Sequence, residues 1–174
     1  FCNHTSSSWY INWNQSGQQN KRSGTDRPAP KPIQADYKIV EALKEAKELG
    51  LKAVTIVGDG EPTLHKQFVN IINDIKALDI DIGVFSNMSF KKKEVFDCFL
   101  KNLFYVRGSI DACNKETHKK SHGLDDFDLV INNIKELLDK RGSNPFPVIG
   151  VQYVCNQWNY REVVEAAEFY KSIG

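Results

Sequence analysis

The stretch AVTIVGDGEP, residues Ala53–Pro62, decides the fold of this chain. Its first half, Ala53–Val57, is short, rich in β-branched residues and almost entirely apolar. That pattern is typical of a parallel strand covered on both faces, because a half-exposed strand alternates apolar with polar residues. Gly58–Pro62 then ends the strand in a glycine-rich turn. The stretch therefore predicts a buried strand and a turn at its carboxyl end.

Helices and strands alternate on both sides of this stretch. Before it, apolar residues recur at three- and four-residue steps over Ala35–Leu49, with Asp36 as N-cap and Gly50 as the stop, which predicts an amphipathic helix. Further strands are expected near Ile82–Phe85, Tyr105–Ile110 and Pro147–Tyr153, and further helices near Gln67–Leu78, Lys92–Leu103, Asp126–Lys140 and Tyr160–Ser172. Such alternation predicts right-handed crossovers and an α/β fold with a parallel sheet, open or closed into a barrel.

Residues 3–34 differ in composition from the rest of the chain. They are rich in Ser, Asn, Gln, Gly and Pro, and their aromatics Trp9, Tyr10 and Trp13 follow no helix or strand period. We expect a long polar loop, a feature that is uncommon in compact domains and is usually either functional or disordered.

The overall composition is that of an ordinary globular protein. The 174 residues are 41% hydrophobic and 26% charged, and 23 Lys+Arg against 22 Asp+Glu give a formal charge of +1. This balance excludes disordered, collagen-like and rod-like chains, and it disfavours a nucleic-acid partner without ruling one out. No apolar run reaches the ~18 residues of a membrane span, and four scattered cysteines argue against a disulfide framework. We expect a cytoplasmic protein that acts on a small molecule or a peptide.

Polar residues follow each predicted strand, where ligands bind in parallel α/β folds. Backbone N–H groups of the Gly58–Pro62 turn can bind an anion and Glu61 can pair with an ammonium group, which together suit a zwitterion. The alternative is a plain tight turn. Ser109 and Asp111 are two residues apart, so on a strand they point to one side and suit a sugar diol. The alternative is a strand end capped toward the next helix.

Several of these segments resemble one enzyme superfamily. VTIVGDGEPTLH at Val54–His65 resembles the second strand and GGEP turn of radical S-adenosylmethionine (SAM) enzymes, and VRGSIDA at Val106–Ala112 resembles their V-R-V-S-L-D-A fourth strand. Weaker correspondences are Ser86-Asn87 with Thr-Asn-Gly, Glu116, His118 and Gly123 with E-x-H…G, and Asn159–Glu162 with N-Y-R-E. The resemblance covers nearly the whole chain. It implies a partial (β/α)6 barrel, with residues 1–174 as a single core domain that is incomplete at both ends.

The superfamily holds its cluster with a C-x3-C-x2-C motif whose last cysteine commonly follows an aromatic residue. Phe1-Cys2 matches only the end of that motif, and Ser6 and Trp9 stand where cysteines would be needed further along. The resemblance therefore implies that Cys2 is the third ligand of a [4Fe–4S] cluster. We expect the other two cysteines to precede Phe1 in a longer protein.

The resemblance also implies a reaction and a set of contacts. Three thiolates leave one iron open for SAM, and one electron then cleaves SAM to a 5′-deoxyadenosyl radical that abstracts hydrogen from an unidentified substrate. An electron donor such as flavodoxin or ferredoxin is implied as a partner. The residues implied at the SAM site are Gly58, Asp59, Gly60 and Glu61 at the methionine amino group, Ser86 and Asn87 in the pocket wall, Ser109 and Asp111 at the ribose, Arg107 toward the carboxylate, and Val151 and Tyr153 beside adenine.

Other interpretations stay open at this point. The chain could be a non-catalytic, radical-SAM-like binding domain that has lost its cluster. An α/β-barrel lyase or aldolase needs a strand-end lysine, and none of the predicted strand ends offers one. His118 and His122 are spaced like a zinc-binding pair or belong to a solvated helix start. Cys113 and Cys155 bind a further cluster, donate a hydrogen atom or are structural thiols.

Overall fold

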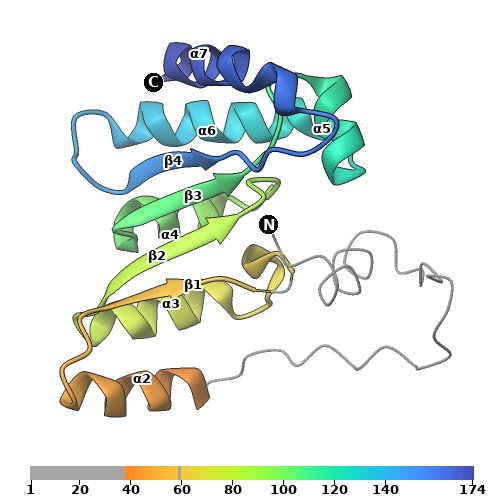
Figure 1. Ribbon diagram of the computed structural model, residues 1–174. Coiled ribbons are helices and arrows are strands. Elements are labelled where there is room, and N and C mark those ends of the chain that lie inside the picture. The colour runs from red at the N-terminus through yellow and green to blue at the C-terminus, as the bar shows by residue number, and fades with distance from the viewer. Residues whose placement is uncertain (1–37, 59) are drawn as a thin grey trace, which may run out of the picture.

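The computed structural model describes residues 38–58 and 60–174. Four parallel strands form one sheet in the order β1-β2-β3-β4, so each strand lies beside its predecessor in the chain (Figure 1). The strands are β1 (Ala53–Ile56), β2 (Asp81–Ser86), β3 (Tyr105–Ser109) and β4 (Val148–Gln152). The helices are α2 (Lys38–Glu48), α3 (Phe68–Ala77), α4 (Lys93–Asn102), α5 (Lys115–His122), α6 (Phe127–Arg141) and α7 (Val163–Ile173), with 3-10 turns η1 (Pro62–Leu64) and η2 (Tyr160–Glu162). The predicted parallel α/β sheet is confirmed.

The main core lies between the sheet and the helices that connect its strands. Figure 1 shows α3 and α4 behind the sheet, as right-handed crossovers that all follow the same strand order require. Ile82 and Val84 of β2 and Val106 of β3 point to these helices and are at most 1% exposed. They meet Ile72 and Phe99 in one apolar cluster. Burying one such side chain contributes about 1.5–3 kcal/mol, so this layer fixes the register of the strands.

Three local features differ from the sequence prediction. The strand β1, predicted to be covered on both faces, alternates exposed and half-buried residues. The helix α5 was not among the predicted elements, because its sequence KETHKKSH has no apolar period. It is held by caps instead: the Asn114 side chain accepts a hydrogen bond from Thr117 N at 2.9 Å, and Gly123 ends the helix at φ 74°. The helix predicted from Tyr160 begins as η2 and becomes α-helical at Val163.

The inner face of the sheet, opposite the helices, carries side chains in rows. In the lowest row the Tyr105 ring leans across Gly83, where an added Cβ would come within 2.1 Å of the ring. The Tyr105 hydroxyl and Thr55 Oγ1 are then 2.6 Å apart and hydrogen-bonded. Arg107 lies one row nearer the carboxyl end of β3, and Ser109 lies at that end. From the amino ends of the strands to their carboxyl ends, the inner face therefore carries the Thr55–Tyr105 pair, then Arg107, then Ser109.

Among the described helices, none is long and apolar enough to cross a membrane.

Candidate functional site

The turn after β1 is tied to the end of β2 by the Glu61 carboxylate. Oε1 accepts hydrogen bonds from Thr63 N at 3.1 Å, Thr63 Oγ1 at 2.8 Å and Ser86 Oγ at 2.9 Å. Oε2 accepts one from Asn87 N at 2.6 Å. The turn is also tight, since a Cβ added at Gly58 would lie 3.2 Å from Gly60 O. Glu61 therefore holds the ends of two neighbouring strands together.

Two opposing effects act on the Glu61 carboxyl. Burial raises its pKa, and the hydrogen bonds from Asn87, Thr63 and Ser86 partly offset that rise because they favour the ionised form. The sequence suggested that Glu61 pairs with a ligand's ammonium group. In the structure both oxygens are already used by donors of the chain, so the side chain positions the turn. Asp59, Cys2 and the expected loop at residues 3–34 lie outside the described residues.

At the ends of β2 and β3, buried and free polar groups are clearly separated. Ser86 is 2% exposed, and besides donating to Glu61 its hydroxyl accepts from Met88 N at 3.0 Å. Asn87 uses its side-chain oxygen to accept from Ser89 N at 2.9 Å. Within the described part of the chain, the Asn87 amide nitrogen and the Ser109 hydroxyl donate to nothing. These two partly exposed groups are free to bind a ligand at the rim of the sheet, which is formed by the carboxyl ends of the strands.

Asp111 lies elsewhere than its spacing suggested. The chain leaves strand geometry after Ser109, and Asp111 adopts φ 55°, in the left-handed region. Its side chain is buried, and Oδ1 accepts a hydrogen bond from Val154 N at 2.7 Å. Ser109 and Asp111 therefore do not face one sugar diol side by side. Asp111 instead holds the segment that follows β4.

Asn159 completes this attachment, a role that sequence reasoning missed. It is fully buried, and its Nδ2 donates to Asp111 O and to Val154 O, both at 2.8 Å. Its Oδ1 accepts from Asn156 N at 2.6 Å. The NYRE resemblance marked the position, but only the fold brings it to Asp111. The loop after β4 is thus fixed to the carboxyl end of β3.

A pair of histidines lies beneath this rim. His118 is 3% exposed, its Nε2 is 2.8 Å from Asp126 Oδ1, and its ring stacks on His122 with centroids 4.8 Å apart. His122 Nε2 lies 3.5 Å from Asp111 Oδ2. The interpretation of this segment as a solvated helix start is therefore wrong for His118, because the ring packs against Phe127. His118 is thus bonded to Asp126 and stacked on His122, whose Nε2 has no hydrogen-bond partner among the described residues.

The histidine pair predicts a pH dependence of stability. Burial, with a smaller contribution from neighbouring His118, lowers the pKa of His122 from 6.5, while Asp111 and Asp126 oppose the shift. The unfolded chain therefore binds a proton at higher pH than the folded one, so the free energy of unfolding falls as the pH drops below about 6.5. Urea denaturation at pH 7.5 and 5.5 measures it. H122Q is expected to lose less stability than wild type over this interval, and an equal loss in both would contradict the prediction.

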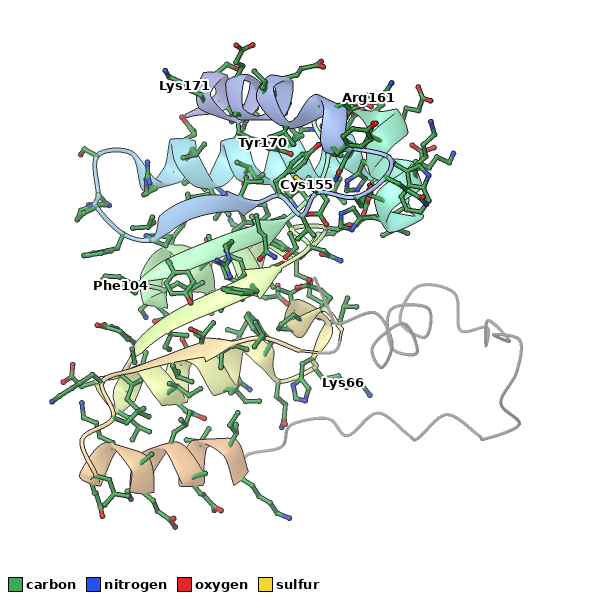
Figure 2. The ribbon with its side chains drawn as sticks, in the orientation of Figure 1. Lys66, Phe104, Cys155, Arg161, Tyr170 and Lys171 are labelled. Carbon is green, nitrogen blue, oxygen red and sulfur yellow. The ribbon has the colours of Figure 1, made fainter. Side chains whose placement is uncertain are left out.

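The described cysteines do not form a metal site. Cys98 is buried on α4, as expected for a small apolar residue, and Cys113 is buried with Sγ 3.7 Å from Glu162 Oε2. Cys155 is exposed just after β4 (Figure 2). Among the residues that the structure describes, no group of three or more His, Cys, Asp or Glu side chains is placed to hold a metal ion. A zinc role for His118 and His122 therefore has no third ligand there.

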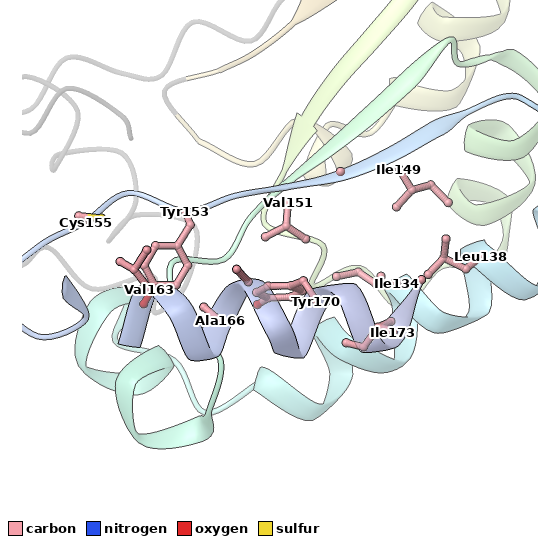
Figure 3. Close-up of a pocket in the computed structure, with 13 residues that line it drawn as sticks. Ile134, Leu138, Ile149, Val151, Tyr153, Cys155, Val163, Ala166, Tyr170 and Ile173 are labelled. Carbon is pink, nitrogen blue, oxygen red and sulfur yellow. The ribbon is translucent and has the colours of Figure 1, made fainter. Parts of the chain in front are cut away.

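A cavity of about 380 Å³ lies on the other side of β4, between this strand and α7 (Figure 3). Val151 and Tyr153 point into it, so the expectation that they flank adenine at the strand-end rim is wrong. The Tyr153 hydroxyl donates to Asn159 O at 3.0 Å and the Tyr170 hydroxyl donates to Ala112 O at 2.5 Å. With both hydroxyls bonded to the backbone, this apolar cavity is part of the packing between sheet and helix.

Comparison with known proteins decides the family. Residues 19–170 match the family model of the Radical SAM superfamily. The chain belongs to the radical SAM superfamily. A probable GTP 3′,8-cyclase of Saccharolobus islandicus is 33% identical over 137 residues, 78% of this chain and 43% of that protein. The corresponding protein of Methanocaldococcus jannaschii is 30% identical over 132 residues, 75% of this chain and 43% of that protein. The radical SAM chain described here thus spans less than half the length of these curated relatives.

Solved structures show the same fold. Streptococcus suis SuiB bound to precursor peptide SuiA superposes with a TM-score of 0.70 at 20% identity, over 84% of this chain and 32% of SuiB. Archaeal TYW1 superposes with a TM-score of 0.53 at 17% identity, over 78% of this chain and 48% of TYW1. The family and the α/β fold with parallel strands predicted from the sequence are confirmed. Membership of the radical SAM superfamily implies SAM and an iron–sulfur cluster as cofactors.

Proposed function

We propose that this chain is the core of an enzyme that cleaves SAM reductively and uses the resulting radical to abstract hydrogen from a substrate. Cys2 and two further cysteines of the full-length protein would hold a [4Fe–4S] cluster. When bound, this cluster supplies the single electron that splits SAM into methionine and a 5′-deoxyadenosyl radical. An electron donor such as flavodoxin or ferredoxin would supply that electron from outside.

The strand-end rim supports this proposal, because its polar groups divide into free and bonded ones. The free groups are the Asn87 side-chain amide nitrogen and the Ser109 hydroxyl, which would contact SAM together with the backbone of the Gly58–Gly60 turn. Glu61, Ser86 and Asp111 would act through them, since their side chains are bonded to the backbone at the neighbouring strand ends. A rim whose shape is fixed before the ligand arrives lowers the entropy cost of binding.

The cluster assignment predicts a sharp difference between two cysteine variants. In full-length protein reconstituted without oxygen, C2A is expected to lose most of its bound iron and its visible cluster absorbance, because one thiolate ligand is gone. C155A is the matched control, since Cys155 is exposed and away from any cluster motif. Iron content per chain checks the prediction. Equal iron in C2A and wild type would remove Cys2 from the cluster.

Two further readouts bear on the proposal. A protein that binds SAM but no iron would be the non-catalytic binding domain that the sequence also allowed. GTP is the first substrate to test, because the curated relatives are named as probable GTP 3′,8-cyclases. Consumption of GTP together with formation of 5′-deoxyadenosine would extend that activity to this protein.

A further inference from the structure

Arg107 is a charged side chain on the inner face without an acidic partner in the described part of the chain. Its guanidinium stacks on the Phe85 ring, 3.7 Å from the centroid. Nε is buried and has no hydrogen-bond acceptor, and none of the ion pairs among the described residues includes Arg107. A guanidinium stays charged at any pH that a protein tolerates, and among the described residues no carboxylate pairs with that of Arg107.

The space beside Arg107 is open on the side away from Phe85. In the sheet register Arg107 pairs with Phe85 on β2 and with Gly150 on β4. A Cβ built on Gly150 meets nothing within 4 Å, whereas one built on Gly83 in the row below strikes the Tyr105 ring. Ile149 and Val151 line the cavity on the helix side of β4. Because side chains alternate along a strand, a side chain at position 150 would point to the inner face of the sheet. The Phe85 ring, the Arg107 guanidinium and the open space at Gly150 thus lie in one row across the sheet.

The position of this row relates it to the strand-end rim. Arg107 and Ser109 are two residues apart on β3, which places them about 7 Å apart along the strand. The row lies further from the strand ends than the rim, and the hydrogen-bonded Thr55–Tyr105 pair occupies the row on its other side. A molecule bound at Arg107 could therefore extend along the inner face toward the rim.

We infer that Arg107 and the gap at Gly150 hold an oxyanion of the substrate, a phosphate or a carboxylate, beneath the SAM site. The inference rests on the proposed function, because it takes the rim as the place of SAM and the inner face as the place of substrate. It replaces the contact with the SAM carboxylate that the family resemblance implied for Arg107. The guanidinium fork matches the paired oxygens of either anion, and Phe85 holds it flat for that contact. Gly150 matters because a side chain there would occupy the space of the anion.

The test uses cluster-loaded, full-length protein and two probes, pyrophosphate for the phosphate group and citrate for the carboxylate. Calorimetry is expected to detect at least one of them in wild type. R107M removes the guanidinium and G150V fills the gap. Each is expected to lower the affinity for the probe that binds by about 10- to 100-fold, the range of a charge-assisted contact. G150V is expected to fold, since its Cβ has room and valine suits a strand.

R161M is the matched control, because Arg161 also stacks on an aromatic ring, that of Tyr160, but is exposed. It should bind the probe like wild type. The inference is overturned if neither probe binds wild type, if R107M and G150V bind it as wild type does, or if R107M weakens SAM rather than the probe. Tighter binding of pyrophosphate would identify the substrate group as a phosphate, and tighter binding of citrate would identify it as a carboxylate. Absence of 5′-deoxyadenosine from every variant would reject the proposed function, while the probe affinities would still report on this site.

Discussion

Replacement of Glu61 by alanine is expected to lower the free energy of unfolding by about 2–4 kcal/mol and to weaken SAM binding at least about 10-fold. The carboxylate accepts four hydrogen bonds, two from Thr63, one from Ser86 and one from Asn87 N. Alanine leaves these donors without an acceptor at a partly buried site. It also frees the Gly58–Gly60 turn from β2, so the turn no longer holds the shape that we propose for the ligand.

The matched control is E61Q, which keeps the shape of the side chain and one oxygen. Its amide oxygen can still accept from Thr63 or Ser86, but its NH2 group opposes Asn87 N, where an acceptor is needed. We expect E61Q to lie between wild type and E61A in urea denaturation and in SAM titration. If E61A were as stable as wild type and bound SAM equally well, the carboxylate would have no part in holding the turn.

Asp111 is expected to be nearly as sensitive, for a different reason. D111A removes the acceptor for Val154 N and places alanine at φ 55°, a region that disfavours residues other than Gly, Asn and Asp. The lost bond and the backbone strain together predict a loss of about 2–4 kcal/mol. The loop after β4 should loosen first, because Val154 N loses its acceptor, whereas Asn159 keeps its bond to the backbone oxygen of residue 111. Hydrogen exchange of the Val154 amide reports that loosening.

D111N separates the two causes. Asparagine tolerates a positive φ and keeps an oxygen that can accept from Val154 N, so we expect it to lose less than about 1 kcal/mol. Equal loss in D111A and D111N would mean that the negative charge itself, facing His122, carries the effect. Protection of the Val154 amide should then fall in both variants alike.

The fold was largely predictable because most of its elements bury a continuous apolar pattern. The helices α3, α4 and α6 were located within a few residues, since each places an apolar stripe against the sheet. The strand at Ala53–Ile56 was located too, but it alternates exposed and half-buried residues, so the prediction that both of its faces are covered is wrong. The helix α5 was not, because caps at Asn114 and Gly123 rather than an apolar face define it. A periodic pattern of apolar residues reveals helices that bury one face, and a short polar helix such as α5 has no such pattern.

The candidate site was predictable in place but not in detail. A polar rim at the carboxyl ends of parallel strands follows from the strand order. The roles of its side chains depend on partners far away in the chain: Ser86 lies 25 residues from Glu61, and Val154 lies 43 residues from Asp111. The spacing of residues in the sequence cannot show which carboxylates will accept hydrogen bonds from distant backbone N–H groups. Likewise, the gap beside Arg107 depends on the register that places Gly150 opposite it.

The reductive cleavage of SAM is the central claim, and one measurement tests it most directly. Full-length protein carrying its cluster is mixed with SAM and dithionite without oxygen, and 5′-deoxyadenosine and methionine are quantified over time. The account predicts that both products form together and in equal amounts, and that E61A forms them more slowly at limiting SAM. A protein that retains its cluster and binds SAM, yet forms no 5′-deoxyadenosine above the dithionite-only control, would contradict it.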